Sequence, residues 1–306
     1  MEIYLAKTQG FCAGVAFAID IVEQALQKYG SPLYVYHEIV HNTYVVNGFR
    51  SKGVVFVEDI ADVPSGARII FSAHGIPPSV LEKAKERKLK FVDATCPLVT
   101  KVHNEAVKFS EHEYETVLIG HLGHQELIGT AGYVDPVLLH IVETEENIDH
   151  LQVDPQKKVA YITQTTLSVD DTTAMIEKLK RKFPNLIGPP RSDLCYATQN
   201  RQDAVKDLAK ICDVIIICGS PNSSNSNRLR ETGEKAGASS YIIDNADELD
   251  FSILEGKKKV GISSGASVPR VIVDELVARL QGHFPGAIVH AFENPEKNIV
   301  FALPRI

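Results

Sequence analysis

The chain has 306 residues, of which 44% are hydrophobic and 23% charged, so it can bury a large core. Its formal charge of −7, without a basic run interleaved with aromatic residues, argues against nucleic acids and membranes as partners. The N-terminal apolar stretch is too short for a signal peptide, and the roughly 20 apolar residues of a spanning helix never occur together. We therefore expect a cytoplasmic protein.

Short runs rich in Val and Ile alternate with helical patterns, which is typical of parallel sheets with crossover helices. A coarse threefold repeat is visible, in which a cysteine introduces a helix and two strand-loop-helix units follow. The first copy starts at Cys12 and continues with PLYVYHEIVHN and ARIIFSAHGIPP. The second starts where FVDATC meets Pro97, a residue suited to the first helical position, and continues with TVLIGHLGHQE and VAYITQTTLS. The third starts at Cys195 and continues with VIIICGSPNSSNSN and VGISSGASVP.

The repeat predicts an α/β protein, built as a trefoil of three lobes with small, mainly parallel sheets. The expected lobes are 1–96, 97–193 and 194–282, and 283–306 is expected to form a terminal strand pair or tail. Polar residues follow the apolar strands, at the sheet edge where open parallel sheets bind ligands. Three such edges could surround one central site.

Five cysteines, none in a C-x-x-C pair and without a secretory signal, argue against disulfides, zinc ribbons and thioredoxin-type motifs. Cys12, Cys96 and Cys195 occupy matching positions at helix starts, where free N–H groups and the helix dipole favour thiolates. Three thiolates would leave one iron of a four-iron cluster open, which indicates catalysis, and zinc is the competing metal. Cys212 and Cys218 follow apolar patterns and are expected in the core.

Three of the eleven histidines directly follow apolar strands, namely His41, His74 and His124. At strand ends facing one cavity they could donate hydrogen bonds to phosphate or supply protons. The role of His121 stays open. Glu126, two residues beyond His124, is the best candidate for an acid, although a first-turn acid that only favours its helix is an equal interpretation.

Hydroxyl and amide donors gather in two loops, as Ser223, Ser224, Asn225 and Ser267. Such residues often only cap helices, but several donors beside helix-start N–H groups suit a phosphate. In TQTTLS, Thr165 or Thr166 could contact a substrate hydroxyl, and a capping role is as good an interpretation.

These motifs closely resemble the landmarks of one family over essentially the full length: GFCAGV, VHN, SAHG, DATCPLV, GHLGHQE, TQTTLS, DLCYATQNRQ, GSPNSSNSNRL and GASVP. The family is that of the LytB-type 4-hydroxy-3-methylbut-2-enyl diphosphate reductases, which end the non-mevalonate isoprenoid pathway. The resemblance implies removal of the allylic hydroxyl by two electrons and two protons, which gives isopentenyl and dimethylallyl diphosphates. We see no departure from the family pattern at the site.

The resemblance also implies roles for individual residues. A 4Fe-4S cluster would be held by Cys12, Cys96 and Cys195, and would become 3Fe-4S if the open iron were lost. The diphosphate would be bound by His41, His74, His124, Ser223, Ser224, Asn225 and Ser267. Thr165 would contact the substrate hydroxyl, and Glu126 would feed a proton relay. The open iron would bind the hydroxyl oxygen as a Lewis acid, and a ferredoxin or flavodoxin would supply the electrons.

Two other functions stay open at this stage. A non-redox hydratase or dehydratase could use an open cluster for its Lewis acidity alone, and it would turn over without electrons. A zinc-stabilised phosphometabolite-binding protein could use the same thiolates and loops without catalysis, and it would contain stoichiometric zinc when prepared without oxygen.

Overall fold

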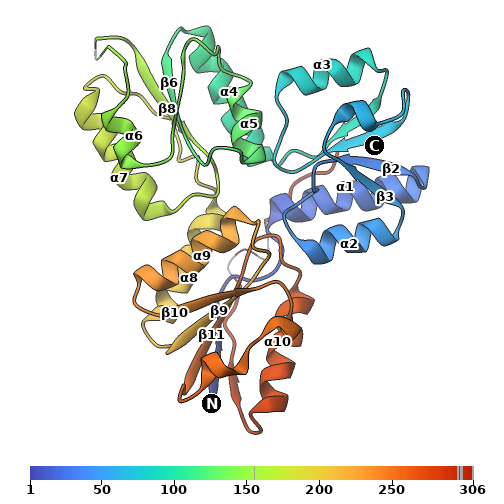
Figure 1. Cartoon of the computed structure of the whole chain (residues 1–306), viewed down its shortest axis with the longest axis vertical. Coiled ribbons are helices and arrows are strands. Elements are labelled where there is room, and N and C mark those ends of the chain that lie inside the picture. The colour runs from blue at the N-terminus through green and yellow to red at the C-terminus, as the bar shows by residue number, and fades with distance from the viewer. Residues whose placement is uncertain (155, 295, 297–298, 305–306) are drawn as a thin grey trace. The chain divides into compact units, whose positions relative to one another are not determined.

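The structure, a computed structural model, describes residues 1–306 except 155, 295, 297–298 and 305–306. Strands alternate with helices along most of the chain, and the described strands form three sheets (Figure 1). The strand pairs of these sheets are all parallel in the described residues. The prediction of an α/β protein with small, mainly parallel sheets is therefore confirmed.

The largest sheet has the strand order β10-β9-β11-β1-β12. Its strands are β1 (Glu2–Leu5), β9 (Val214–Cys218), β10 (Ser239–Ile243), β11 (Lys259–Ser264) and β12 (Ile288–His290). Its helices are α8 (Tyr196–Ala209), α9 (Ser224–Lys235), α10 (Arg270–His283), η2 (Ala246–Glu248) and η3 (Phe251–Leu254). Successive residues of β9 face opposite sides, so that Ile216 packs with Leu276 of α10 and Ile217 packs with Leu208 of α8.

The second sheet has the order β3-β2-β4-β5. Its strands are β2 (Leu33–Tyr36), β3 (Val54–Val57), β4 (Arg68–Phe71) and β5 (Lys90–Asp93). The helices of this part of the chain are α1 (Ala13–Tyr29), α2 (Thr43–Ser51), η1 (Ile60–Asp62) and α3 (Pro78–Glu86). Phe71 of β4 packs with Val80 and Ala84 of α3, so one apolar cluster joins this helix to the sheet.

The third sheet has the order β7-β6-β8. Its strands are β6 (Glu115–Ile119), β7 (Leu139–Val142) and β8 (Val159–Thr163). Its helices are α4 (Pro97–Glu111), α5 (Gln125–Ala131), α6 (Glu145–Asp149) and α7 (Val169–Lys182). Pro97 starts α4, as predicted, and Val102 of this helix packs with Leu118 of β6. The opposite face of the strand is covered by α7, where Leu179 packs with Ile119.

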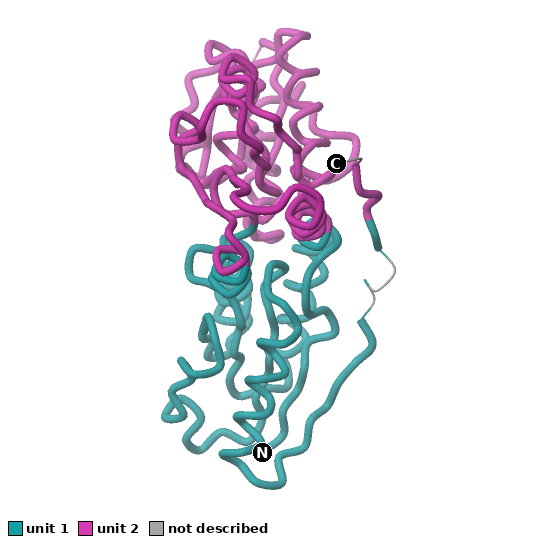
Figure 2. The backbone as a smooth tube through the Cα atoms, turned by 90° about the vertical axis from the view of Figure 1, so that its right-hand side faces the viewer, with its two compact units in different colours: residues 1–16, 40–48, 196–300 teal, residues 17–39, 49–195, 301–306 magenta. Residues whose placement is uncertain are grey.

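The described residues form two compact units (Figure 2). Unit 1 comprises residues 1–16, 40–48 and 196–300 and contains the largest sheet. Unit 2 comprises residues 17–39, 49–195 and 301–306 and contains the other two sheets. The division into three lobes at residues 96 and 193 stays a prediction.

The first strand lies in a different sheet from the one expected for residues 1–96. Glu2 of β1 pairs with Lys259 of β11 and with Ile288 of β12, so β1 belongs to the sheet of the C-terminal segment. The reason is packing, because Ile3 and Leu5 are buried in the apolar cluster of that sheet. The predicted terminal segment 283–306 contains β12, and its residues 295, 297–298 and 305–306 lie outside the described residues.

No helix in the part of the chain that the structure describes has the length and apolar character needed to cross a membrane.

Candidate active site

Glu126 lies in the first turn of α5, in unit 2. His124 is the N-cap residue of this helix, and its Nδ1 accepts a hydrogen bond from the Glu126 backbone N–H at 3.1 Å. An accepting Nδ1 carries no proton, so the ring proton of a neutral His124 lies on Nε2. The cap therefore determines both where the helix begins and which tautomer the histidine adopts.

The carboxyl group of Glu126 is bonded twice to Thr165. Oε1 accepts from the Thr165 backbone N–H at 2.6 Å, and Oε2 accepts from Thr165 Oγ1 at 3.0 Å. Glu126 is only 3% exposed, and this burial raises its pKa to about 7. The two hydrogen bonds from Thr165 act against the rise, and the negative charge of Asp193 adds to it. A carboxyl group with a pKa near 7 can both hold and release a proton under neutral conditions.

His74 lies in the loop after β4, where its Nδ1 is 3.3 Å from Ser72 Oγ. Its ring meets that of His124 edge to face, with the centroids 6.0 Å apart and the planes at 88°. Helix α5 can approach this loop because Gly129 has no side chain. A Cβ atom at Gly129 would lie 3.3 Å from the backbone carbonyl group of Gly75. Unit 2 thus brings two of the predicted histidines together.

Cys96 and Cys195 are tied to these loops through their main chain. The Cys96 N–H donates to the Ala73 carbonyl oxygen at 3.0 Å, one residue before His74. The Cys195 N–H donates to the Thr165 carbonyl oxygen at 3.1 Å. Each of these cysteines therefore lies against a loop that carries a predicted site residue.

Cys12 lies in unit 1, directly before α1. Its N–H donates to the Ala266 carbonyl oxygen at 3.0 Å, and its Sγ accepts from the Val15 N–H at 3.4 Å. The next residue after Ala266, Ser267, donates through Oγ to the His41 carbonyl oxygen at 2.9 Å. Unit 1 thus brings together Cys12, Ser267 and the backbone of His41, although these residues are far apart in sequence.

Ser223, Ser224 and Asn225 form the start of α9 in unit 1. Ser223 is the N-cap, and its Oγ accepts from the Ser226 N–H at 3.3 Å. Asn225 is 7% exposed, and in the described chain neither its Oδ1 nor its Nδ2 has a hydrogen-bond partner. A buried amide group without partners costs free energy, so it indicates a polar ligand or water at this helix start.

The loop before α9 also contacts the segment after His41. Ser220 Oγ accepts from the Thr43 N–H at 3.1 Å and donates to the Asp244 carboxylate. The predicted phosphate-binding residues of unit 1 therefore lie on three loops, and the loop of His41 is bonded directly to each of the other two.

Two further buried polar residues were missed by the sequence analysis. Asn42 accepts from the Val45 N–H at 3.0 Å through Oδ1, and its buried Nδ2 has no partner in the described chain. Its signal was an asparagine directly before a helix, in VHN. Asp193 is buried two residues before Cys195, where it accepts from the Thr163 N–H at 2.9 Å and pairs with Lys101 at 2.8 Å. No local pattern in the sequence identifies those two partners.

The five cysteines fall into two groups. Cys212 and Cys218 are buried, as expected, and burial raises the pKa of each thiol to about 12, so both stay protonated. Cys12, Cys96 and Cys195 are partly exposed. An iron-sulfur cluster is held by thiolates, so the two thiols that burial keeps protonated are the poorer candidates.

The three partly exposed cysteines come from both units, with Cys12 in unit 1 and Cys96 and Cys195 in unit 2. Among the described residues, no three His, Cys, Asp or Glu side chains are grouped so that they could hold a metal ion. Thiols are nevertheless the groups that bind iron-sulfur clusters, so these residue types fit the cluster. The assignment of the three cysteines as its ligands stays a prediction.

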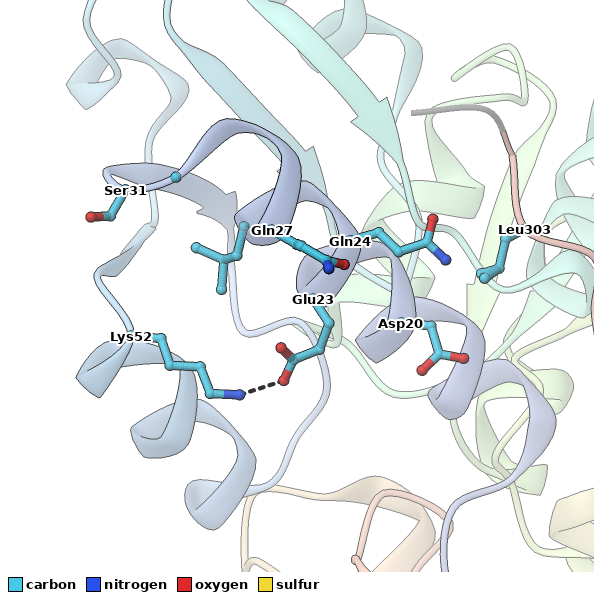
Figure 3. A pocket seen from close by; sticks show the side chains of 9 residues that line it. Asp20, Glu23, Gln24, Gln27, Ser31, Lys52 and Leu303 are labelled. Carbon is cyan, nitrogen blue, oxygen red and sulfur yellow. Dashed lines mark hydrogen bonds and ion pairs between the residues drawn. The ribbon is translucent and has the colours of Figure 1, made fainter.

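A cavity of about 550 Å³ lies beside α1 in unit 2 (Figure 3). Lys52 and Glu23 form an ion pair of 2.5 Å at its wall, and both side chains are about half exposed. None of the predicted site residues lines this cavity.

Comparisons with known proteins identify the family. The family model described as LytB protein matches residues 3–281. The 4-hydroxy-3-methylbut-2-enyl diphosphate reductase of Methylococcus capsulatus is 49% identical, over 100% of this chain and 98% of its own length. The protein of the same name from Azoarcus sp. strain BH72 is 50% identical, over 99% of this chain and 97% of its own.

A solved structure resembles this chain over nearly its whole length. It is that of the E-1-hydroxy-2-methyl-but-2-enyl-4-diphosphate reductase from Plasmodium falciparum, with a TM-score of 0.96 and 38% identity, covering 99% of this chain and 95% of that chain. The family model, the curated relatives and the solved structure each match most of the chain. The chain therefore belongs to the LytB protein family.

Proposed function

We propose that this chain reduces 4-hydroxy-3-methylbut-2-enyl diphosphate to isopentenyl and dimethylallyl diphosphates. In this reaction the allylic C–O bond breaks, a C–H bond forms and the oxygen leaves as water, so each turnover consumes two electrons and two protons. The observation that carries the proposal is the buried Glu126 carboxyl group, bonded to Thr165 and able to hold a proton near neutral pH. Membership of the LytB family supports the same reaction.

The proposed cofactor is one 4Fe-4S cluster on Cys12, Cys96 and Cys195. These three cysteines are partly exposed and adjacent to helix starts, and each donates its main-chain N–H to a neighbouring loop. When bound, the cluster would supply the electrons, and its iron without a cysteine ligand would supply Lewis acidity toward the hydroxyl oxygen. Cys12 also accepts a helix-start N–H on its sulfur.

The proton steps are assigned to Glu126 and Thr165. When Glu126 carries a proton, its O–H can donate across the 3.0 Å contact to Thr165 Oγ1, and the Thr165 O–H can then donate to the leaving oxygen. When Glu126 is ionised, it accepts the Thr165 O–H again. The threonine hydroxyl thus passes protons while the carboxyl group stays buried.

The diphosphate is assigned to hydrogen-bond donors from several loops. They are His41, His74, His124, Ser223, Ser224, Asn225 and Ser267. His124 suits this role because its Nε2 carries the ring proton when the ring is neutral, and Asn225 suits it because its amide is buried without a partner in the described chain. Holding the diphosphate would place the hydroxyl group reproducibly, so these residues should affect turnover as well as affinity. His124 is also a candidate for proton transfer.

Anaerobic turnover with a chemical reductant tests the proposed reaction. The allylic diphosphate should be consumed only when reductant is present, with both five-carbon diphosphates as products. Turnover without a reductant would support the hydratase or dehydratase alternative instead. We further propose that a ferredoxin or flavodoxin is the donor and that the protein works in the cytoplasm.

Metal analysis and a cysteine variant test the cofactor. Anaerobically prepared protein should contain iron, sulfide and a broad visible absorption, and Cys96→Ser should lose or damage that cluster. Stoichiometric zinc without sulfide would support the binding-protein alternative. An intact cluster in Cys96→Ser would refute the ligand assignment.

A further inference from the structure

A lysine on the helix that Cys96 introduces holds the segment that leads to Cys195. Lys101 lies on α4, five residues after Cys96. Its Nζ donates to the carbonyl oxygens of Arg191 at 3.0 Å and Ser192 at 3.5 Å, and it pairs with Asp193 at 2.8 Å. All three contacted residues lie within four positions before Cys195, and all of these residues belong to unit 2.

The Asp193 carboxylate extends this contact to the strand that carries the proposed proton relay. Its side chain is fully buried, and its second oxygen accepts from the Thr163 N–H at the end of β8 at 2.9 Å. Two residues later, the Thr165 carbonyl oxygen accepts from the Cys195 N–H. The segment before Cys195 is therefore held at the Asp193 side chain and at the carbonyl oxygens of Arg191 and Ser192. Cys195 itself is held at its main-chain N–H.

An arginine on the helix that Cys195 introduces makes the equivalent contact toward Cys12. Arg201 lies on α8, six residues after Cys195, and is 0% exposed. Its Nη2 donates to the Gly10 carbonyl oxygen at 2.8 Å, two residues before Cys12. Its Nη1 donates to the Glu296 carboxylate at 3.0 Å. The Gly10 N–H donates to Ser264 Oγ at 3.3 Å, so this peptide segment is also held at both its amide and its carbonyl.

Buried cations are costly unless their contacts are satisfied, and an apolar side chain would fill the same helix position more cheaply. Arg201 is fully buried and pairs with Glu296, whereas the Lys101 side chain is 30% exposed and pairs with both Asp193 and Glu105. Both cations also donate to main-chain carbonyl oxygens close to a cysteine, while Arg201 Nε has no partner in the described chain. The same arrangement occurs twice, on two helices that each follow a cysteine.

We propose that Lys101 and Arg201 are positioning residues that hold the main chain before Cys195 and Cys12, and so the geometry with which these cysteines bind the cluster. The inference rests on the proposed cluster assignment. The helix after Cys12 provides a comparison without such a cation. The positions five and six residues after Cys12 are Phe17 and Ala18, which are buried and apolar. The approach to Cys96 is held by main-chain bonds instead, including the Ala94 N–H to the Phe71 carbonyl oxygen at 3.0 Å.

The test measures cysteine reactivity one residue at a time. Full-chain protein is prepared anaerobically, stripped of metal by a chelator and treated with iodoacetamide, and the alkylation rate of each cysteine is followed by mass spectrometry. In Lys101→Met, Cys195 should react about tenfold faster, and in Arg201→Met, Cys12 should react about tenfold faster, the factor that about 1.4 kcal/mol of lost ordering represents. Cys96 should keep its rate in both.

Cluster lifetime provides the second readout on the holoprotein. The visible absorption of Lys101→Met and Arg201→Met should decay several-fold faster than that of the wild type in the presence of a chelator. Lys101→Arg should restore the lifetime, because an arginine can pair with the carboxylate and bond a carbonyl at once. If Arg201→Met fails to fold, Glu296→Gln weakens instead the ion pair that holds the Arg201 side chain, and it leaves no cavity.

Matched controls are Lys180→Met and Arg230→Met. Lys180 pairs with Glu177 and Arg230 pairs with Glu234 on helix surfaces, each at a distance of 2.7–2.8 Å. Such exposed pairs contribute little, so neither variant should change any alkylation rate. Unchanged rates in the Lys101 and Arg201 variants, or an equal increase at all three cysteines, would overturn the inference. Wild-type protein without iron and sulfide would instead refute the proposed cluster, while the alkylation pattern would still decide the positioning role.

Discussion

Two buried polar side chains, one in each unit, differ in their hydrogen bonding. In unit 2 the Glu126 carboxyl group is fully bonded inside the protein, because both of its oxygens accept from Thr165. In unit 1 the buried amide of Asn225, at the start of α9, has no partner in the described chain. The first arrangement suits a group that exchanges protons with a fixed neighbour, and the second suits a group whose partner is a ligand.

The strongest test of this contrast is Glu126→Gln. The amide can still accept from the Thr165 N–H, but it cannot give up a proton, so turnover should fall about 100-fold or more. Substrate affinity and iron content should stay near the wild-type values, as measured by a binding titration and by metal analysis. A variant with a near-normal rate would rule out Glu126 as the acid.

The pH dependence of stability tests the burial of Glu126. Because burial raises the pKa from 4.5 to about 7, the folded state holds a proton that the unfolded state has already released between these pH values. The contribution of Glu126 to the free energy of unfolding is therefore fully present below pH 4.5. It is lost as the pH rises through about 7, by up to about 3 kcal/mol.

Thermal unfolding between pH 4.5 and 8 measures this effect in wild type and Glu126→Gln. The wild type should lose stability over the interval by more than the variant does. Burial also raises the pKa of Glu105 to about 7, but this group titrates in both proteins and cancels in the difference. Parallel curves for the two proteins would show that Glu126 is not the buried acid described above.

Asn225→Ala should separate binding from stability. Hydrogen bonds to a charged group contribute about 1.5–3 kcal/mol, so diphosphate affinity should fall at least about tenfold. Removing an amide that has no partner in the described chain should leave the melting temperature of the free protein unchanged or higher. The matched control is Asn227→Ala, whose Nδ2 donates to the carbonyl oxygens of Pro221 at 2.7 Å and Ser223 at 3.0 Å.

The control should show the reverse pattern, because it loses bonds inside the protein. Its melting temperature should fall, and its affinity for the diphosphate should change less than that of Asn225→Ala. If both variants lose stability and both keep affinity, the α9 start is an ordinary capped helix.

The smallest expected effect belongs to Thr165→Ser. Serine keeps the hydroxyl and the backbone N–H, so the rate should stay within about twofold of the wild type, whereas Thr165→Val removes the hydroxyl and should lose at least about tenfold. Equal rates in the serine and valine variants would show that the proton does not pass through this hydroxyl. Steady-state turnover with a chemical reductant makes the comparison.

Much of the fold followed from local patterns. Apolar runs identified strands such as Val214–Cys218, and Pro97 marked the start of α4, because these signals depend only on neighbouring residues. The placement of β1 did not follow, since Ile3 and Leu5 would suit the edge of any sheet with an apolar face. The pairing partner of a four-residue strand is decided by tertiary packing.

The candidate site shows the same division. Which residue types stand after strands and at helix starts could be read from the sequence, and this identified Glu126, Thr165 and Asn225 as candidates. The double contact of Glu126 with Thr165, 39 residues away, could not be read, because side-chain hydrogen bonds between distant loops have no local signal. The pKa of Glu126 is raised by its burial, which also depends on tertiary packing, so the raised pKa appeared only with the structure.

The sequence by itself determined the family, the α/β class and the three cysteines that differ from the core pair by their position at helix starts. Only the tertiary structure decided that Lys101 reaches the segment before Cys195 and that Arg201 reaches Gly10, 191 residues away. The physical reason is range. Helix starts and strand patterns arise from contacts within a few residues, whereas buried ion pairs and carbonyl contacts arise only when packed elements bring distant groups within about 3 Å of each other.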